Sequence, residues 1–405
     1  MTWPLVRLDT VAIRGSGHTP NQKHPEYWNG GVKWVSLADS SALDKRYIYD
    51  TEKKISALGI RHSSAVLHPK GTVIVSRDAG VGKSAILGDE MAVSQHFIAW
   101  QCNEQELYGE YLYQWLQSNK PEFERMAVGS TVKTIGLAYF EKLCIPLPSI
   151  EIQTQLAIIL ATWDTAIETT EQLIAAKERL YQHELSRLIS RSKHSRRSIG
   201  DFAREVSEYG NGRLTTLCDF LTESRELDTE NNPAKRLTVR LHLQGVEARV
   251  VRGKENDKAT VYYRRRAGQL IYGKQNIFRG AIGIIPDDLD GYSSSQDLPT
   301  FDISPDVDPQ WLYYWLSRKD FYTSLEAFAA GSGSKRLHPE EFFKIQIILP
   351  DLATQTAITR YLNALRKEID LLGQSAEALK TQKRGLMQKL LTGKWRIPIK
   401  QGVPT

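Results

Sequence analysis

The chain contains little cysteine and no long apolar segment. Its three cysteines, Cys102, Cys144 and Cys218, are odd in number and include no close pair, which argues against a disulfide framework and a Cys-x-x-Cys metal knuckle. The first residues lack the apolar run of a signal peptide, and no stretch approaches the ~18 apolar residues of a membrane span. These absences favour a reducing compartment, and we expect a cytoplasmic protein with no membrane partner.

Complete catalytic motifs are also absent from the sequence. Residues 79–84 end like a phosphate-binding P-loop, but Arg77 stands where that loop needs its first glycine, so a glycine-rich turn that presents Lys83 is the better interpretation. No Pro-Asp is followed by the Asp/Glu-x-Lys of a metal nuclease. The chain has no Pro-Pro, which the base-gripping loop of an adenine methyltransferase requires. The nine histidines show no metal-ligand spacing. We expect neither a catalytic residue nor a metal site.

The 405 residues suffice for two to four domains at roughly 100 to 200 residues each, and they contain an internal repeat. Residues 111–116 resemble residues 311–316. In both places a Gly/Ser segment followed by lysine comes next, at 129–133 and 331–335. From there an offset of 202 residues holds without a gap, for example from Gln153 to Gln355. A register kept this long indicates a duplicated architecture.

Aromatic residues recur in the duplicated segment at 111–116 and 311–316. Tyr113 and Trp115 have helical spacing and apolar neighbours, as do Tyr313 and Trp315. We therefore expect these four rings to belong to the core rather than to stack on bases.

Two long helices are predicted, one after each Leu-Pro. Both segments lack proline, contain almost no glycine and are rich in strong helix formers. Apolar residues recur every seven positions, which favours a coiled coil formed by the two helices, each ~60 Å long; two helices of an ordinary bundle are the alternative. The predicted seam consists of Leu160, Ile167, Ile174, Tyr181, Leu188, Ile358, Leu365, Leu372, Leu379 and Leu386.

The regions before the helices contain short apolar runs, such as 72–75 and 282–285, punctuated by Gly, Pro, Asp and Asn. This pattern is typical of small mixed α/β domains with many loops. The predicted fold class is α+β: two mixed α/β domains separated by two long antiparallel helices that form a coiled coil, with an internal pseudo-two-fold repeat. We expect domains at 1–149 and 194–350, helices at 150–193 and 351–394, and a C-terminal tail at 395–405. The basic segment 191–197 marks the boundary after the first helix.

Basic residues gather in the predicted loops. The net charge of +6 says little by itself, but Lys and Arg beside Gly, Ser and Thr suit phosphate contact, and Asn, Gln and Arg can read base edges. Because Gly/Ser followed by Lys recurs in both halves, we expect at least one of Lys133 and Lys335 to contact DNA. The candidate DNA-binding residues are Arg14, Arg77, Lys83, Ser130, Lys133, Lys274, Gln275, Asn276, Arg279, Ser334, Lys335 and Arg336, and the run Arg264-Arg265-Arg266 adds to the second set.

Several motifs together make the chain resemble the specificity subunit of type I restriction-modification systems over essentially its full length. They are Leu147-Pro148 with Gln153 and Asp164, the repeat Leu349-Pro350 with Gln355 and Ile358, and the helix ending at 383–394. Residues 77–86, 268–272 and 279–284 are similar to loops of that family's target-recognition domains. The first long helix departs from the pattern, since it lacks the Gly-Leu-Met-Gln ending of the second.

This resemblance implies a non-catalytic subunit with two target-recognition domains, each reading one half of a bipartite, asymmetric site in double-stranded DNA. It implies that the helices set the spacing and dock two DNA adenine methyltransferase (modification) subunits, which restriction subunits (ATP-dependent translocase/nuclease) join. S-adenosylmethionine, ATP and Mg are then expected on the partner subunits, and no cofactor on this chain. From the residues alone, a coiled-coil scaffold without DNA readout and a self-contained DNA-modifying enzyme remain the alternatives.

Overall fold

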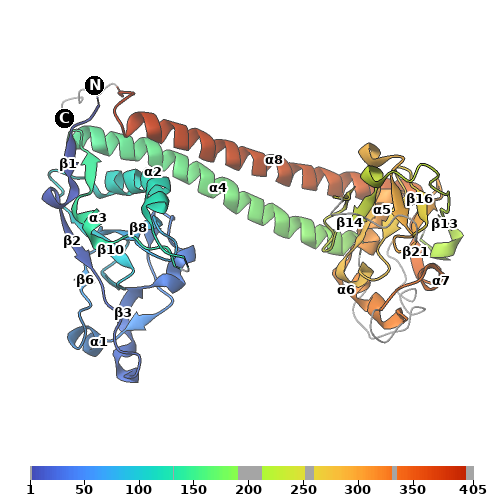
Figure 1. Ribbon diagram of the computed structural model, residues 1–405, viewed down its shortest axis with the longest axis horizontal. Coiled ribbons are helices and arrows are strands. Elements are labelled where there is room, and N and C mark those ends of the chain that lie inside the picture. The colour runs from blue at the N-terminus through green and yellow to red at the C-terminus, as the bar shows by residue number, and fades with distance from the viewer. Residues whose placement is uncertain (1, 131, 190–211, 251–259, 331–334, 398–405) are drawn as a thin grey trace. The chain divides into compact units, whose positions relative to one another are not determined.

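The computed structural model describes residues 2–130, 132–189, 212–250, 260–330 and 335–397. The chain divides into two compact units: unit 1 combines residues 1–173 with 372–405, and unit 2 consists of residues 174–371. The predicted segment 191–197 lies outside the described residues. Both long helices, α4 (Ile150–Ile189) and α8 (Leu352–Leu390), contribute one part to each unit (Figure 1).

Unit 1 is built on a five-stranded sheet of order β2-β10-β7-β8-β4 and a four-stranded sheet of order β5-β3-β9-β6. A two-stranded sheet joins β1 to β11, next to the start of α4. The strands are β1 (Leu5–Arg7), β2 (Ala12–Ser16), β3 (Trp28–Val35), β4 (Tyr47–Ile48), β5 (Lys54–Ile55), β6 (Leu67–His68), β7 (Val73–Ser76), β8 (Ser84–Leu87), β9 (Met91–Val93), β10 (Phe97–Cys102) and β11 (Cys144–Pro146). The helices are α1 (Ala57–Arg61), α2 (Gly109–Met126) and α3 (Leu137–Glu141), besides the first part of α4 and the last part of α8.

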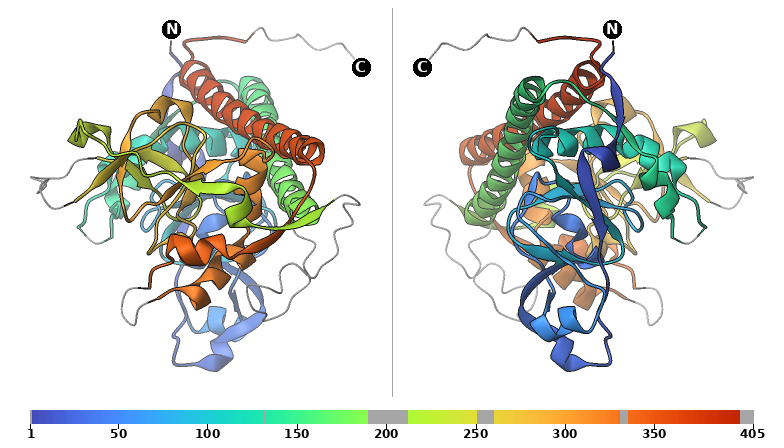
Figure 2. Two further views of the ribbon diagram at one scale, coloured as in Figure 1. Left: turned by 90° about the vertical axis from the view of Figure 1, so that its right-hand side faces the viewer. Right: turned by 90° about the vertical axis from the view of Figure 1, so that its left-hand side faces the viewer.

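The helix α2 lies between the main sheet of unit 1 and α4 (Figures 1 and 2). The strands β7 and β8 are buried on both faces, which explains their continuous apolar character. Tyr111, Tyr113 and Trp115 of α2 are also buried in the core. The interpretation of these aromatic residues as core is confirmed, because their rings are not available for stacking on bases.

The described residues of unit 2 form a four-stranded sheet of order β13-β20-β17-β18 and three two-stranded sheets, β12-β21, β14-β15 and β16-β19. Trp315 is buried and Tyr313 half-buried against the same core as Tyr272. The strands are β12 (Arg213–Thr216), β13 (Leu221–Glu223), β14 (Leu237–Val239), β15 (Val246–Ala248), β16 (Tyr262–Arg264), β17 (Leu270–Tyr272), β18 (Ile282–Ile284), β19 (Ser293–Ser295), β20 (Thr300–Ile303) and β21 (Gln346–Leu349). The short helices are α5 (Pro309–Leu316), α6 (Lys319–Ser324) and α7 (Pro339–Phe343).

The long helices run antiparallel within each unit. The interhelix pairs Asp164–Lys383 and Glu171–Lys380 show this for unit 1, and Lys177–Glu368 and Glu178–Arg366 show it for unit 2. The heptad residues face inward to different degrees. Leu160, Tyr181, Ile358 and Leu365 are buried, while Ile167, Ile174, Leu188, Leu372, Leu379 and Leu386 are half-buried. Each helix part also packs on its own unit, so the seam serves two purposes: it holds the helices together and it completes the core of each unit.

A buried glutamine fixes the start of each long helix. The Gln153 side chain accepts a hydrogen bond from the Tyr108 amide at 2.9 Å and donates to the carbonyls of Glu106 and Pro148 at 2.8 and 2.9 Å. In unit 2, Gln355 accepts from the Asp308 amide at 2.8 Å and donates to the Asp306 and Pro350 carbonyls. Both side chains are fully buried, and each one ties the helix to its own unit through backbone groups only.

We expect Gln153→Ala to destabilise unit 1 by about 2–4 kcal/mol, because it leaves one buried amide and two buried carbonyls without partners. Gln155, two residues along the helix and half-buried, provides the matched control, and Gln155→Ala should change the stability by less than ~0.5 kcal/mol. Urea unfolding curves of the three proteins measure the difference. Equal losses in both variants would contradict the role of the buried glutamine.

Candidate nucleic-acid interface

Two loops that are distant in sequence meet in unit 1. The hairpin turn between β7 and β8, residues 77–83, lies beside the loop of residues 129–133, which an antiparallel bridge between Val128 and Thr134 closes. The Ile135 amide donates to the Arg77 carbonyl at 2.8 Å, and a second bridge joins Asp78 to Thr134. We call residues 77–83 the hairpin turn and residues 128–134 the bridged loop of unit 1.

Unit 2 repeats this arrangement. Its hairpin turn, residues 273–281, connects β17 to β18, and its bridged loop, residues 330–336, is closed by two hydrogen bonds between Ala330 and Arg336. The Leu337 amide donates to the Lys274 carbonyl at 2.9 Å. Leu337 lies 202 positions after Ile135, so the same backbone hydrogen bond holds the two loops together in both units. The sequence predicted the loops one by one, but not that they would be adjacent.

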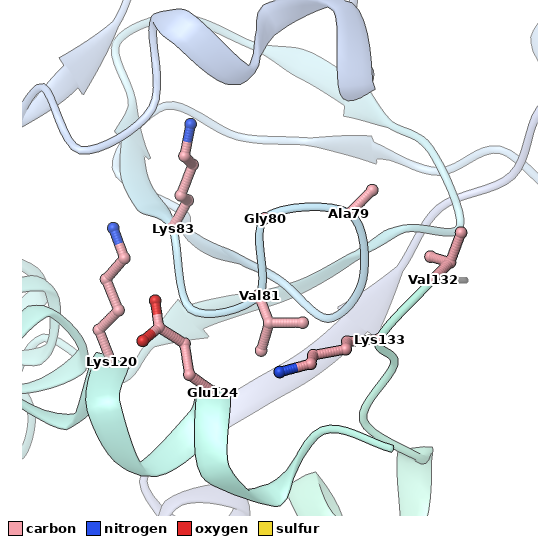
Figure 3. Close-up of a pocket in the computed structure, with 8 residues that line it drawn as sticks. All are labelled: Ala79, Gly80, Val81, Lys83, Lys120, Glu124, Val132 and Lys133. Atoms are coloured by element: carbon pink, nitrogen blue, oxygen red, sulfur yellow. The ribbon is translucent and has the colours of Figure 1, made fainter. Parts of the chain in front are cut away.

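The hairpin turn and the bridged loop of unit 1 border a cavity of about 520 Å³, shown in Figure 3. Lys133 and Val132 contribute to it from the bridged loop, and Ala79, Gly80, Val81 and Lys83 from the turn. Positive φ angles at Ala79, Gly80 and Gly82 give the turn its sharp curvature. Lys133 and Ser130 are exposed. Lys133 is therefore a cation that is available to a phosphate without first leaving a buried partner.

The other predicted cations of unit 1 have intramolecular partners. The Lys83 Nζ donates to the backbone oxygen and the hydroxyl of Ser40, both at 2.9 Å. The Arg77 Nε donates to the Ile135 carbonyl at 3.0 Å. The Arg14 guanidinium forms an ion pair with Asp9 at 3.0 Å and lies 3.7 Å from Glu141. Lys83 and Arg77 shape the two loops, and Arg14 lies on β2, outside them.

The predicted residues of unit 2 gather around Arg336. Its guanidinium lies 3.9 Å from Asp297, and the Gln275 side-chain oxygen accepts from Nη2 and Nε at 2.6 and 3.0 Å when the amide is oriented towards it. Lys274 is half-buried beside Gln275, and Lys335 pairs with Glu326 at 3.1 Å at the exposed surface. Surface pairs of this kind are weak and exchange readily for a phosphate.

The remaining predictions of unit 2 have mixed outcomes. Asn276 and Arg279 are exposed in the hairpin turn, while Ser334 lies outside the described residues. The run at 264–266 is not a continuous basic surface, because Arg265 is buried and donates to the Ser294 hydroxyl and the Ser224 carbonyl at 2.8 and 2.7 Å. Burial lowers the pKa of Arg265 to about 10. Arg265 therefore stabilises the fold and cannot contact DNA from this position.

Sequence reasoning missed two features of the unit 1 site. Lys120 of α2 lines the cavity beside Glu124 and forms an ion pair with Asp44 at 2.5 Å. The Nδ1 atom of His96 lies 2.8 Å from the carboxylate of Asp78 in the hairpin turn. Neither residue stands in a loop motif or in the repeat, so no local signal marks them. Among the described residues no cluster of three or more metal-ligating side chains occurs, and no described helix is long and apolar enough to span a bilayer.

The fold is that of a two-unit specificity subunit. A crystal structure of the type I restriction-modification S subunit from M. genitalium matches with a TM-score of 0.54 and 15% identity over 96% of both chains. A chain from a structure on complex assembly and conformational transition of the type I restriction-modification system matches with a TM-score of 0.56 and 15% identity, over 97% of this chain and 98% of that one. The architecture of two recognition domains joined by two long helices is thus shared.

Sequence comparison identifies the family. A family model for the type I restriction modification DNA specificity domain matches residues 1–179 and 257–381, more than half of the chain. The MjaIX specificity subunit of Methanocaldococcus jannaschii is 27% identical, and the match covers 42% of this chain and 40% of that relative. The MjaVIII specificity subunit of the same organism is 21% identical, and the match covers 98% of this chain and 93% of that relative. The chain belongs to the specificity subunits of type I restriction-modification systems.

Lys133→Ala should weaken binding of duplex DNA and lower the slope of log affinity against log salt by about one phosphate contact. Lys133→Arg keeps the charge and serves as the control with an unchanged slope. In unit 2, Lys335→Ala combined with Arg336→Ala should act in the same direction. Fluorescence anisotropy at several salt concentrations measures both effects, with circular dichroism confirming the fold. Salt slopes equal to that of the unsubstituted protein would exclude these residues as phosphate contacts.

Proposed function

We propose that the protein is the non-catalytic subunit that gives a type I restriction-modification complex its DNA sequence specificity, with each unit reading one half of a bipartite, asymmetric site. The observation that carries this proposal is the duplicated pair of loops. The same backbone frame appears twice and carries different side chains, for example Arg77 where unit 2 has Lys274. Two equal frames with unequal side chains suit two half-sites of different sequence.

The proposed partners are two DNA adenine methyltransferase subunits, which restriction subunits join. S-adenosylmethionine, ATP and Mg would be bound by those partners and not by this chain, and the complex would act in the cytoplasm. A pair of exposed leucines supports two equivalent docking surfaces. Leu5 on β1 is 70% exposed and Leu214 on β12 is 56% exposed. Each stands on the short sheet at the start of a long helix, at the same place in its unit.

Substituting either leucine should remove one of the two modification subunits, because a buried charge without a partner is costly at an interface. Leu5→Asp and Leu214→Asp should each leave one bound subunit, and the double variant none. Ile13, which is 74% exposed on β2 and has Thr222 at the equivalent place, provides the control Ile13→Asp. Native mass spectrometry of the purified complexes counts the subunits. Retention of two subunits in every variant would place docking elsewhere.

The long helices are proposed to set the gap between the half-sites. One heptad inserted after Leu173 and another after Leu371 keeps the paired seam in register and adds about 10 Å, which corresponds to roughly three base pairs. The methylated sequence should then contain a gap longer by about three base pairs. The same seven residues inserted after Glu230, in an exposed loop, should leave the gap unchanged. Sequencing of methylated adenines in cells measures the gap, and an unaltered gap after the helix insertions would refute the spacer role.

The two alternatives to this function make different predictions. A self-contained enzyme would methylate or cut duplex DNA when purified alone, whereas the proposed subunit does neither. A protein-binding scaffold would leave the pattern of methylated adenines unchanged when this chain is deleted from cells. Under the proposed function, deletion abolishes methylation at one bipartite sequence only.

A further inference from the structure

The two long helices carry opposite charge although they are copies of one repeat. Within α4 there are six acidic and three basic residues, a net charge of −3. Within α8 there are three acidic and seven basic residues, a net charge of +4. The internal repeat therefore does not extend to the charges of the two helices.

The charges meet at the interface between the helices. Among the described residues four ion pairs join α4 to α8, and in three of them α4 supplies the acid: Asp164–Lys383 at 2.5 Å, Glu171–Lys380 at 2.9 Å and Glu178–Arg366 at 3.3 Å. The exception is Lys177–Glu368 at 2.8 Å. The Asp164–Lys383 pair is the most enclosed, with the Lys383 side chain 11% exposed, and Gln114 of α2 also donates to Asp164 at 2.6 Å.

The offset of 202 residues shows what each pair would become if a helix met a copy of itself. Position 383 in α8 corresponds to 181 in α4, and position 366 corresponds to 164. In unit 2 these equivalents face each other as Arg366 and Tyr181, with the guanidinium carbon 5.7 Å from the ring centroid. The contact thus occurs in both units, once as an ion pair and once as a cation on an aromatic ring.

In a pair of two α4 helices the favourable contacts would be lost. Asp164 of one copy would face Tyr181 of the other copy, where Lys383 stands now. Glu178 of one copy would face Asp164 of the other, where Arg366 stands now. Glu171 would meet Glu178 in place of Lys380. Two like charges at paired positions repel each other, and Asp164 would keep no cation in a partly enclosed place.

A pair of two α8 helices would be unfavourable for the same reason. Lys383, which now pairs with Asp164, would face Arg366 of the other copy. Arg366, which now pairs with Glu178, would face Lys380 of the other copy. Lys380 would also face Gly373, the counterpart of Glu171, and would keep only Glu377 of its own helix as an ion-pair partner. Both kinds of like pair therefore bring charges of one sign together, whereas the unlike pair neutralises them.

We propose that the interface of α4 and α8 is an interaction surface that accepts only the unlike repeat: a half-chain ending in α4 binds a half-chain ending in α8 and rejects its own copy. The partner of each surface is thus a helix of opposite charge with the matching apolar seam. The apolar seams differ too, because Leu372, Leu379 and Leu386 of α8 correspond to Thr170, Lys177 and Glu184 of α4. The charges add to this difference a repulsion between like helices. Selection of the unlike helix acts on assembly and does not depend on DNA recognition.

The test supplies the complete protein as two coexpressed chains, residues 1–200 and 201–405. The N-terminal chain is expressed in two copies, and only one of them carries the purification tag. The other copy and the C-terminal chain each carry a different tag. We expect the purified chain to retain the C-terminal chain in roughly tenfold or larger excess over its own copy, since several ion pairs change sign between the two assemblies. Mass spectrometry quantifies both. Equal recovery of the two chains would overturn the proposal.

A charge exchange distinguishes electrostatic selection from shape. We exchange the charges by D164K, E171K and E178K in the N-terminal chain and by R366E, K380E and K383E in the C-terminal chain. When both kinds of C-terminal chain compete, the original N-terminal chain should retain the original one and the exchanged N-terminal chain the exchanged one. The control E151K with E168K alters two acids of α4 that form no ion pair with α8 among the described residues, and it should keep the original preference. Preference for the same C-terminal chain by every N-terminal chain would show that shape, not charge, selects the partner.

Discussion

The antiparallel packing of α4 against α8 is the contact on which the rest of the structure depends. Each helix is too long to be covered by one recognition unit, and each unit lacks a complete core without both helices. In unit 2, Tyr181 of α4 and Leu365 of α8 belong to the same buried cluster as Trp311. Burial of this seam therefore stabilises the helix pair and the recognition units together.

Buried polar groups give this packing its direction. Apolar heptads permit more than one register, because neighbouring apolar residues can replace one another at small cost. The buried Gln153 and Gln355 fix where each helix starts, and the ion pair of Asp164 with Lys383 fixes which residues face each other. The hydrogen bond that Lys380 makes with Glu171 raises the pKa of Lys380, so that this cation stays charged at the interface.

The repeat and the helices could be predicted from the sequence because they depend on local patterns. A heptad period and a constant offset are visible in one dimension. They predicted helices at 150–193 and 351–394, and the described residues form helices at 150–189 and 352–390. The expected continuation of the second helix to 394 was wrong: after Leu390 the backbone turns, and Gly393 at φ +75° packs against Trp3. A side chain at Gly393 would contact the indole, which no local pattern of residues indicates.

The candidate site was predictable only in part, because the availability of a cation depends on acceptors that are distant in sequence. Lys83 looked like a phosphate ligand, but its acceptor is Ser40, and Arg77 binds a carbonyl 58 positions later. Arg265 stands between two exposed arginines and is itself buried. Lys133 kept its expected exposure because its loop projects beyond the bridge that closes it.

The backbone hydrogen bonds that join the two loops in each unit have a consequence for which residues of the loops can be substituted. The Ile135 amide donates to the Arg77 carbonyl in unit 1, beside a side-chain bond from Arg77 Nε to the Ile135 carbonyl, and the Leu337 amide donates to the Lys274 carbonyl in unit 2. Residues on the loops can therefore be exchanged while the frame that presents them stays in place. Under the proposed function, substitutions at exposed loop positions such as Ser130 and Asn276 would change the bases that are read without refolding the protein.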